Sequence, residues 1–97
     1  MPRKYLRITE VTKICSVDIK FVKRLEQEQV IHPIVRRSEK VYPLDQVDRV
    51  RVARLLIEEM GVNFEGAEVA LHMREQMIAM QRQFNDILRL LGKELKK

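Results

Sequence analysis

Residues 8–33 read ITEVTKICSVDIKFVKRLEQEQVIHP, and this stretch decides the fold. Its apolar spacing predicts two short helices, at about residues 10–14 and 19–29, joined by a tight turn. Thr9 can cap the first helix and Asp18 the second, because a side-chain oxygen at that position accepts from the free N–H groups of the first turn. Two short helices around a tight turn are typical of a helix-turn-helix.

The second helix has two faces of different chemistry. Val17 and Val22 have the spacing of a hydrophobic staple, which fixes the angle at which the chain enters the helix. Phe21 and Leu25 share the apolar face with Val22. Polar residues at positions i, i+3, i+4 and i+7 share another face: Lys20, Lys23, Arg24 and Gln27. This division is typical of a recognition helix that faces an anionic partner. The alternative is an amphipathic helix whose basic face is only solvated.

A β-hairpin is predicted after this helix. Residues 30–35 form its first strand, in which Pro33 is tolerated at a sheet edge, and residues 40–42 return. Arg36 and Arg37 occupy the tip, where they suit contact with DNA phosphates or the minor groove because the basic helix is adjacent. The candidate DNA-binding residues of helix and hairpin are Lys20, Lys23, Arg24, Gln27, Arg36, Arg37, Lys40 and Tyr42.

The whole segment resembles the start of the MerR-like winged-helix family. The resemblance rests on Ile8, Glu10, Val11, Val17-Asp18, the run from Val22 to Glu26, Val30-Ile31, Pro33 and Lys40-Val41-Tyr42. Ser16 and Gln29 stand where the family usually has glycine, and Leu25 stands where an aromatic residue is common. Lys23 and Lys40 replace the usual arginines. Lysine keeps the attraction to phosphate but lacks the bidentate geometry of arginine.

Residues 61–69, GVNFEGAEV, resemble the signature of one subgroup of that family. The subgroup contains HspR-type heat-shock repressors and CbpM-type modulators of J-domain co-chaperones. With this motif the resemblance extends from Tyr5 to about Leu95. It implies a bacterial protein whose head binds either DNA or a J-domain. A J-domain carries a basic helix, so the basic head of this chain favours DNA.

A long helix is predicted at the end of the chain. A third helix, at about residues 44–60, is terminated by Gly61, and Asn63 caps the long helix that follows. Apolar residues then recur at intervals of three and four, which is a heptad seam. The seam consists of Ala70, Met73, Met77, Met80, Phe84, Ile87 and Leu91. So small a domain cannot bury this seam, and we expect a homodimer.

Three further details of the long helix are expected. Gly92 is expected to end the helix. The family resemblance implies that the two helices of the dimer are antiparallel, because heptads alone do not define orientation. Four apolar residues lie off the seam and either pack on the third helix or enlarge the dimer core: Leu71, Ile78, Leu88 and Leu90.

The net charge of +5 belongs to the first half of the chain. Residues 1–54 hold 13 Lys+Arg against 7 Asp+Glu, whereas residues 55–97 hold 6 against 7. A basic head favours a polyanion partner. A membrane partner is disfavoured, because the chain has no long apolar run and no signal peptide. Cys15 is the only cysteine, so no intrachain disulfide can form, which suits a cytoplasmic protein.

Catalytic and metal sites are not predicted. His32 and His72 are isolated and lack metal-ligand spacing, so no metal or cofactor is expected. The chain shows no nucleophile–base pair and no glycine-rich phosphate loop, and we expect that it is not an enzyme.

These observations define one architecture and two functions. The fold class is mainly α, with a winged helix-turn-helix head over residues 1–62 and a dimerisation helix over residues 63–97. The preferred function is a dimeric transcriptional regulator that binds double-stranded DNA and has no effector domain of its own. The alternative is a CbpM-like modulator that binds the J-domain of a DnaJ-type co-chaperone.

Overall fold

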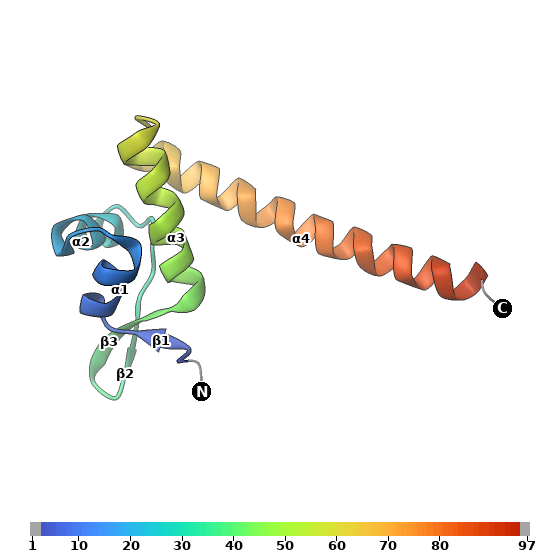
Figure 1. The fold of residues 1–97 in the computed structure, drawn as a ribbon, viewed down its shortest axis with the longest axis horizontal. Helices are drawn as coiled ribbons and strands as arrows, with labels where there is room; N and C mark the ends of the chain where they lie inside the picture. Colours follow the sequence, from blue (N-terminus) through green and yellow to red (C-terminus); the bar gives the residue numbers. More distant parts are fainter. Residues whose placement is uncertain (1–2, 96–97) are drawn as a thin grey trace.

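The computed structural model describes residues 3–95. The sequence also predicts a basic N-terminal arm at residues 1–4 and a basic tail at residues 93–97, and the outer residues of both, 1–2 and 96–97, lie outside the described part. In chain order the elements are β1 (Tyr5–Leu6), α1 (Ile8–Cys15), α2 (Ile19–Gln27), β2 (Ile34–Arg36), β3 (Glu39–Pro43), α3 (Leu44–Arg54), the π-helical segment η1 (Leu55–Glu59) and α4 (Phe64–Leu95). Figure 1 shows a head built from α1–α3 and the small sheet, from which α4 extends. The predicted winged helix-turn-helix with a long C-terminal helix is confirmed.

The two short helices begin where side chains satisfy their first turns. Asp18 caps α2 as predicted, since its Oδ1 accepts from the N–H of Phe21 at 2.8 Å. The prediction that Thr9 caps α1 is wrong, because the helix already begins at Ile8. The carboxylate of Glu10 reaches back and accepts from the N–H of Arg7 at 2.9 Å. An acid in the first turn therefore satisfies a backbone donor at the start of the helix, where Thr9 was expected to act as the cap.

The turns after α1 and α2 both require left-handed backbone. Ser16 has a φ of 56° and Gln29 a φ of 60°. These are the two positions at which the MerR-like pattern usually has glycine. In this conformation the Cβ atom lies too close to the following carbonyl, which costs about 1–2 kcal/mol for a residue other than glycine.

Replacing Ser16 or Gln29 with glycine is therefore expected to stabilise the head. The net gain should be about 0.5–1 kcal/mol per site, because relief of strain exceeds the entropy that glycine adds to the unfolded chain. Urea denaturation measures the change. Lys13→Gly, at an exposed position of α1, is the control and should lose up to about 1 kcal/mol. Two destabilised variants at Ser16 and Gln29 would contradict this account.

The wing is a three-stranded antiparallel sheet with the order β1-β3-β2. The predicted first strand, residues 30–35, begins too early, because β2 starts only at Ile34. Val30 and Ile31 are instead buried in the core, and their N–H groups donate to the carbonyl of Leu25. Pro33 follows without an N–H group, and strand pairing starts after it.

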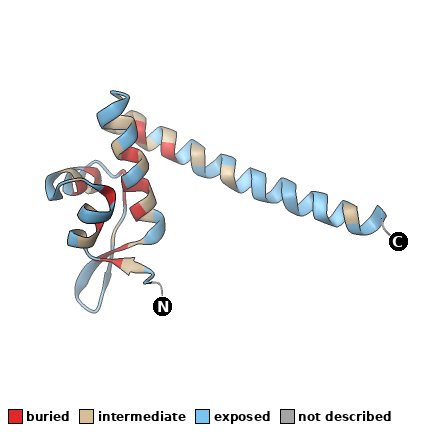
Figure 2. Cartoon of the chain, in the orientation of Figure 1, coloured by how far each residue is buried: buried red, intermediate tan, exposed pale blue. Residues whose placement is uncertain are grey.

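The core lies between α1, α2, α3 and the base of the wing (Figure 2). Its largest fully buried side chains are Tyr42, Leu25, Ile31, Leu71, Val11, Val22, Val30 and Val50. Leu71 is the contribution of α4, so the first turns of the long helix belong to the packed head. The remainder of α4 projects away from this core and is almost entirely exposed.

The GVNFEGAEV motif forms the joint between η1 and α4. Gly61 ends the preceding helix with a φ of 73°, and Asn63 caps α4 by accepting from the N–H of Gly66 at 2.7 Å. A Cβ on Gly66 would lie 2.9 Å from Cγ1 of Val62 and 3.0 Å from Oδ1 of Asn63. Ala67 is fully buried. The motif therefore specifies how α4 leaves the head.

The long helix α4 runs for 32 residues, to Leu95. The prediction that Gly92 ends it is wrong. A glycine within an exposed helix costs only about 1 kcal/mol, and α4 continues through it. Among residues 3–95, no helix is both long and apolar enough to cross a membrane.

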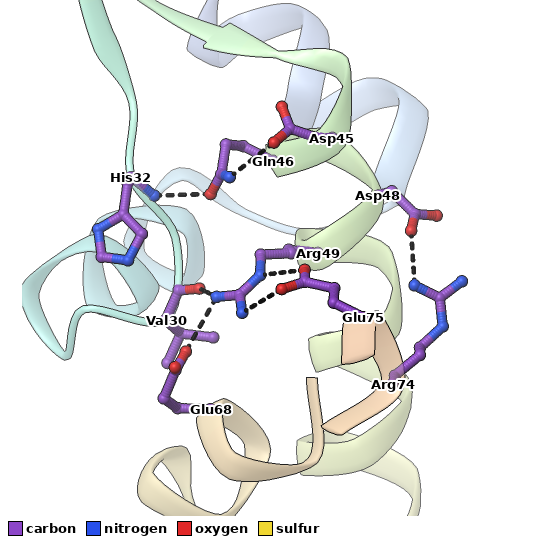
Figure 3. A network of polar contacts seen from close by, with 9 residues as sticks. All are labelled: Val30, His32, Asp45, Gln46, Asp48, Arg49, Glu68, Arg74 and Glu75. Carbon is purple, nitrogen blue, oxygen red and sulfur yellow. Dashed lines mark hydrogen bonds and ion pairs between the residues drawn. The ribbon is translucent and has the colours of Figure 1, made fainter. Parts of the chain in front are cut away.

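A buried arginine fixes α4 against the head (Figure 3). Arg49 of α3 is 5% exposed. Its Nη1 donates to the carbonyl of Val30 and, at 2.9 Å, to Glu68; its Nε and Nη2 donate to Glu75 at 2.7 and 3.0 Å. Because Val30 follows α2 whereas both glutamates belong to α4, one guanidinium joins three elements. Its hydrogen bonds lower the pKa of Glu75.

Candidate nucleic-acid interface

The second helix of the helix-turn-helix presents an open basic face. Val22 and Leu25 are fully buried, so the residues on the other side of α2 face solvent. Lys20, Lys23 and Gln27 are all exposed. Within residues 3–95, neither lysine has a carboxylate at ion-pair distance. Their ammonium groups are therefore free to approach a phosphate or a base edge.

Arg24, which the sequence placed on the same face, has additional contacts. Its Nε lies 3.2 Å from Oε1 of Glu28, and its guanidinium lies 4.6 Å from the ring centre of Phe64. That ring also packs near Phe21, at 6.2 Å between centroids. Arg24 remains 56% exposed, but it also connects α2 to the start of α4. The sequence analysis missed this role of Phe64, whose aromatic ring within the GVNFEGAEV motif was the available signal.

The tip of the wing is a strained turn that carries an arginine. Arg37 and Ser38 have φ values of 53° and 62°, between the paired residues Arg36 and Glu39. A two-residue hairpin turn with positive φ at both positions is normally Asn-Gly or Asp-Gly. Strain that persists at an exposed tip is a feature of functional sites. Arg37 is exposed in this turn.

Lys40 joins the wing to α2. Its Nζ lies 2.7 Å from Oε1 of Glu26, and this hydrogen bond raises the pKa of Lys40. Lys40 is exposed and charged, but part of its charge is balanced. The contact restrains the hairpin against α2. The unpaired lysines of α2 and the arginines at the hairpin tip therefore keep a defined spatial arrangement.

Tyr42 corrects the predicted DNA-binding set. Its side chain is fully buried, because β1 pairs with β3 and places Leu6 opposite Tyr42. Burial raises the pKa of its phenol, and the hydroxyl has no hydrogen-bond partner within residues 3–95. Tyr42 is a core residue and cannot contact DNA in this structure.

Tyr42→Phe is consequently expected to leave the fold intact. Removing a buried hydroxyl that has no partner is neutral or stabilising, by up to about 1 kcal/mol. Thermal unfolding measures this, and DNA affinity should be unchanged. A loss of more than about 1 kcal/mol, or a selective loss of DNA binding, would show that the hydroxyl has a partner.

The remaining candidates for chemistry are structural. Cys15 is buried, its thiol lies 3.7 Å from the carbonyl of Val47, and burial raises its pKa. His32 and His72 line a cavity of about 550 Å³ between α3 and α4. No group of three or more His, Cys, Asp or Glu side chains within residues 3–95 is arranged to hold a metal ion.

The heptad seam lies on the exposed side of α4. Exposed fractions run from 52% to 68% for Met73, Met77, Met80, Phe84, Ile87 and Leu91, while Ala70 is partly buried. Off the seam, Leu71 is fully buried and Ile78 is partly buried. Leu71 packs in the core of the head, which agrees with the first of the two predicted alternatives, packing on the head rather than in a dimer core. Leu88 and Leu90 are exposed, at 50% and 62%.

Comparisons with known proteins agree with this architecture. A family model described as "MerR HTH family regulatory protein" matches residues 6–89. Curated proteins and solved structures gave no match. The matched range contains α1, α2, the wing, α3 and most of α4, including the whole basic face and five of the larger seam residues. The chain belongs to the MerR family of helix-turn-helix regulatory proteins.

Proposed function

We propose that the protein is a dimeric DNA-binding transcriptional regulator of the MerR family. The observation that carries this proposal is the free basic face of α2, with Lys20 and Lys23 exposed and unpaired beside a wing tipped by Arg36 and Arg37. A helix of this kind enters the major groove, and a wing contacts the adjacent phosphates. The proposed contacts are Lys20, Lys23, Arg24, Gln27, Arg36, Arg37 and Lys40.

The exposed seam of α4 supports the proposal of a dimer. Ala67 and Leu71 bury the start of the helix against the head, but the seam faces solvent beyond them. Residues 70–91 cover about 32 Å at 1.5 Å per residue. A continuous apolar stripe of that length on a monomer normally marks an interaction surface. A second α4, antiparallel as in the family, would cover it and hold two heads on one duplex.

A second candidate function has its own support. Arg24 is engaged by Glu28, and Lys40 by Glu26, so two of the proposed DNA contacts are partly neutralised. Lys23 and Lys40 of this chain also stand where the MerR-like pattern usually has arginine. These features favour weaker base recognition, and they support a modulator that binds the J-domain of a co-chaperone through the same head.

Two double substitutions distinguish contacts with DNA bases from contacts with DNA phosphates. Lys23→Ala with Gln27→Ala is expected to remove preference for the protein's own upstream region over random duplex, at about 1–3 kcal/mol for each lost base contact. Arg36→Ala with Arg37→Ala should weaken binding to both duplexes equally, since phosphate contacts carry no sequence information. Fluorescence anisotropy with both duplexes measures this.

The outcome also decides between the two functions. The four side chains are exposed, so the fold should survive, as circular dichroism can verify. If the unmutated protein shows no preference for any promoter fragment and binds a J-domain at micromolar affinity, the regulator proposal is wrong and the modulator function replaces it.

A further inference from the structure

A cationic surface lies at the base of the wing, where Arg36 and Arg37 meet three cations to which the sequence analysis assigned no contact: Arg3, Lys4 and Arg7. A cavity of about 400 Å³ opens there between the described residues of the N-terminal arm (Arg3 and Lys4), β1 and the hairpin. Five cations and one carboxylate line it, together with Tyr5 and Val41. The charged residues are Arg3, Lys4, Arg7, Arg36, Arg37 and Glu39. Figure 1 shows β1 beside β3 at the foot of the head, next to the hairpin.

The arm is held in place by side chains of the head. Arg3 donates two hydrogen bonds to the carboxylate of Glu10, one of them 2.9 Å long. Nε of Arg7 lies 2.9 Å from Oε1 of Glu39. Tyr5 pairs with Pro43 in the sheet. Two of the cations, Arg3 and Arg7, are therefore held by carboxylates of the head before any ligand arrives, so binding would not need to order them.

Three of the five cations have no balancing charge. Lys4, Arg36 and Arg37 have no carboxylate within ion-pair distance among residues 3–95. The guanidinium of Arg36 lies 4.3 Å from the ring centre of Tyr5. Such stacking restrains the side chain and leaves the N–H groups at its edge available. The ring of Tyr5 therefore holds the guanidinium of Arg36 in a position from which its N–H groups can donate to an anion.

The side chains that line the cavity favour phosphate as the ligand, and their spread over an open surface favours a polymer of phosphates. Arginine edges and a lysine are the usual donors to phosphate oxygens. Arg3 and Arg7 remain about 60% exposed, at 58% and 62%, so the cations are spread over an open surface. An open array suits successive phosphates of a backbone better than one small anion, which binds tightly only where donors converge. The surface includes Arg36 and Arg37 and is therefore continuous with the proposed DNA interface.

We propose that the N-terminal arm and the wing base bind the phosphate backbone of duplex DNA, with Lys4 and the Tyr5-stacked Arg36 as the principal contacts. This inference rests on the proposed function and extends its DNA footprint beyond the wing tip. The arm adds phosphate contacts on the flank of the site, whereas α2 faces the major groove.

Lys4→Ala tests the contact. The slope of log affinity against log salt concentration should fall by about 1 for each head, hence by about 2 for a dimer. Lys93→Ala removes the same charge near the far end of α4 and should leave the slope unchanged. Tyr5→Leu should weaken binding, and Tyr5→Phe should not, because the phenylalanine ring preserves the stack beneath Arg36.

The outcomes separate this inference from the function on which it rests. If the unmutated protein binds duplex with a steep salt dependence and Lys4→Ala has the same slope, the arm makes no phosphate contact and only this inference fails. If the unmutated protein binds no duplex, both proposals fail. If inorganic phosphate at low millimolar concentration shifts the Arg36 side-chain NMR signal and duplex does not, the cavity holds a small anion and the backbone proposal is wrong.

Discussion

Replacing Met80 and Phe84 with glutamate is expected to give a monomer, whereas the parent protein is expected to be a dimer. These side chains are 67% and 60% exposed in the single chain and lie at the centre of the proposed seam. Each contributes about 1.5–3 kcal/mol when buried, and each occurs twice in a two-fold dimer. The substitutions also bring like charges together at the interface. Light scattering at micromolar concentration should give a mass near 11.6 kDa for the variant and twice that for the parent.

A charge-matched control separates the seam from the helix as a whole. Ala79→Glu with Asn85→Glu adds the same two charges at exposed positions off the seam, and this variant should remain a dimer. Circular dichroism adds a second readout. Long helices gain most of their stability from packing, so the monomeric variant should lose helicity along α4. A parent protein that is monomeric would contradict the dimer proposal.

Replacing Arg49 with methionine is expected to destabilise the head strongly. It leaves the carbonyl of Val30 buried without its donor, and it releases Glu68 and Glu75 of α4 from their partner on α3. The two carboxylates are 37% and 47% exposed, so water can solvate them and the full penalty of a buried charge does not apply. We expect a loss of about 2–4 kcal/mol in the free energy of unfolding.

Arg51→Met is the matched control two residues later on α3. Arg51 is 64% exposed and pairs with Asp48 across a solvated contact, so its replacement should cost no more than about 1 kcal/mol. Urea denaturation compares the two variants directly. Equal losses would mean that the buried network does not hold α4 to the head.

The same network has a pH signature. Hydrogen bonding to Arg49 lowers the pKa of Glu75 from its ordinary value of 4.5. A lowered folded-state pKa contributes stability above the unfolded value, and that stability is lost as the pH falls through the folded value. The parent should therefore lose stability below about pH 4.5, and the Arg49→Met variant should lose less over the same range.

Local signals were sufficient for most of the fold. The cap at Asp18, the terminator Gly61 and the cap at Asn63 each depend on residues within three positions, and each is present in the structure. The MerR-like pattern usually has glycine at the positions of Ser16 and Gln29. Both are left-handed, although serine and glutamine alone do not signal this conformation.

Long-range contacts were not predictable from the same signals. Arg49 lies on a helix rich in charged residues, and its partner Glu75 is 26 positions away, so no local pattern marks it as buried. Tyr42 was assigned to DNA from its place in the wing, but pairing with β1 encloses it. Arg24 follows the spacing of the basic face, whereas its contact with Phe64 depends on how α4 leaves the head.

The central claim, that the head binds DNA, is tested most directly by NMR titration of the unmutated protein with duplex from its own upstream region. Backbone amide shifts should change at residues 18–27 and 36–42, and the changes should weaken as salt is raised. Shifts at residues 70–95 should stay within the experimental error. Changes confined to residues 70–95, or no changes with duplex and clear changes at residues 18–27 with a J-domain, would contradict the account.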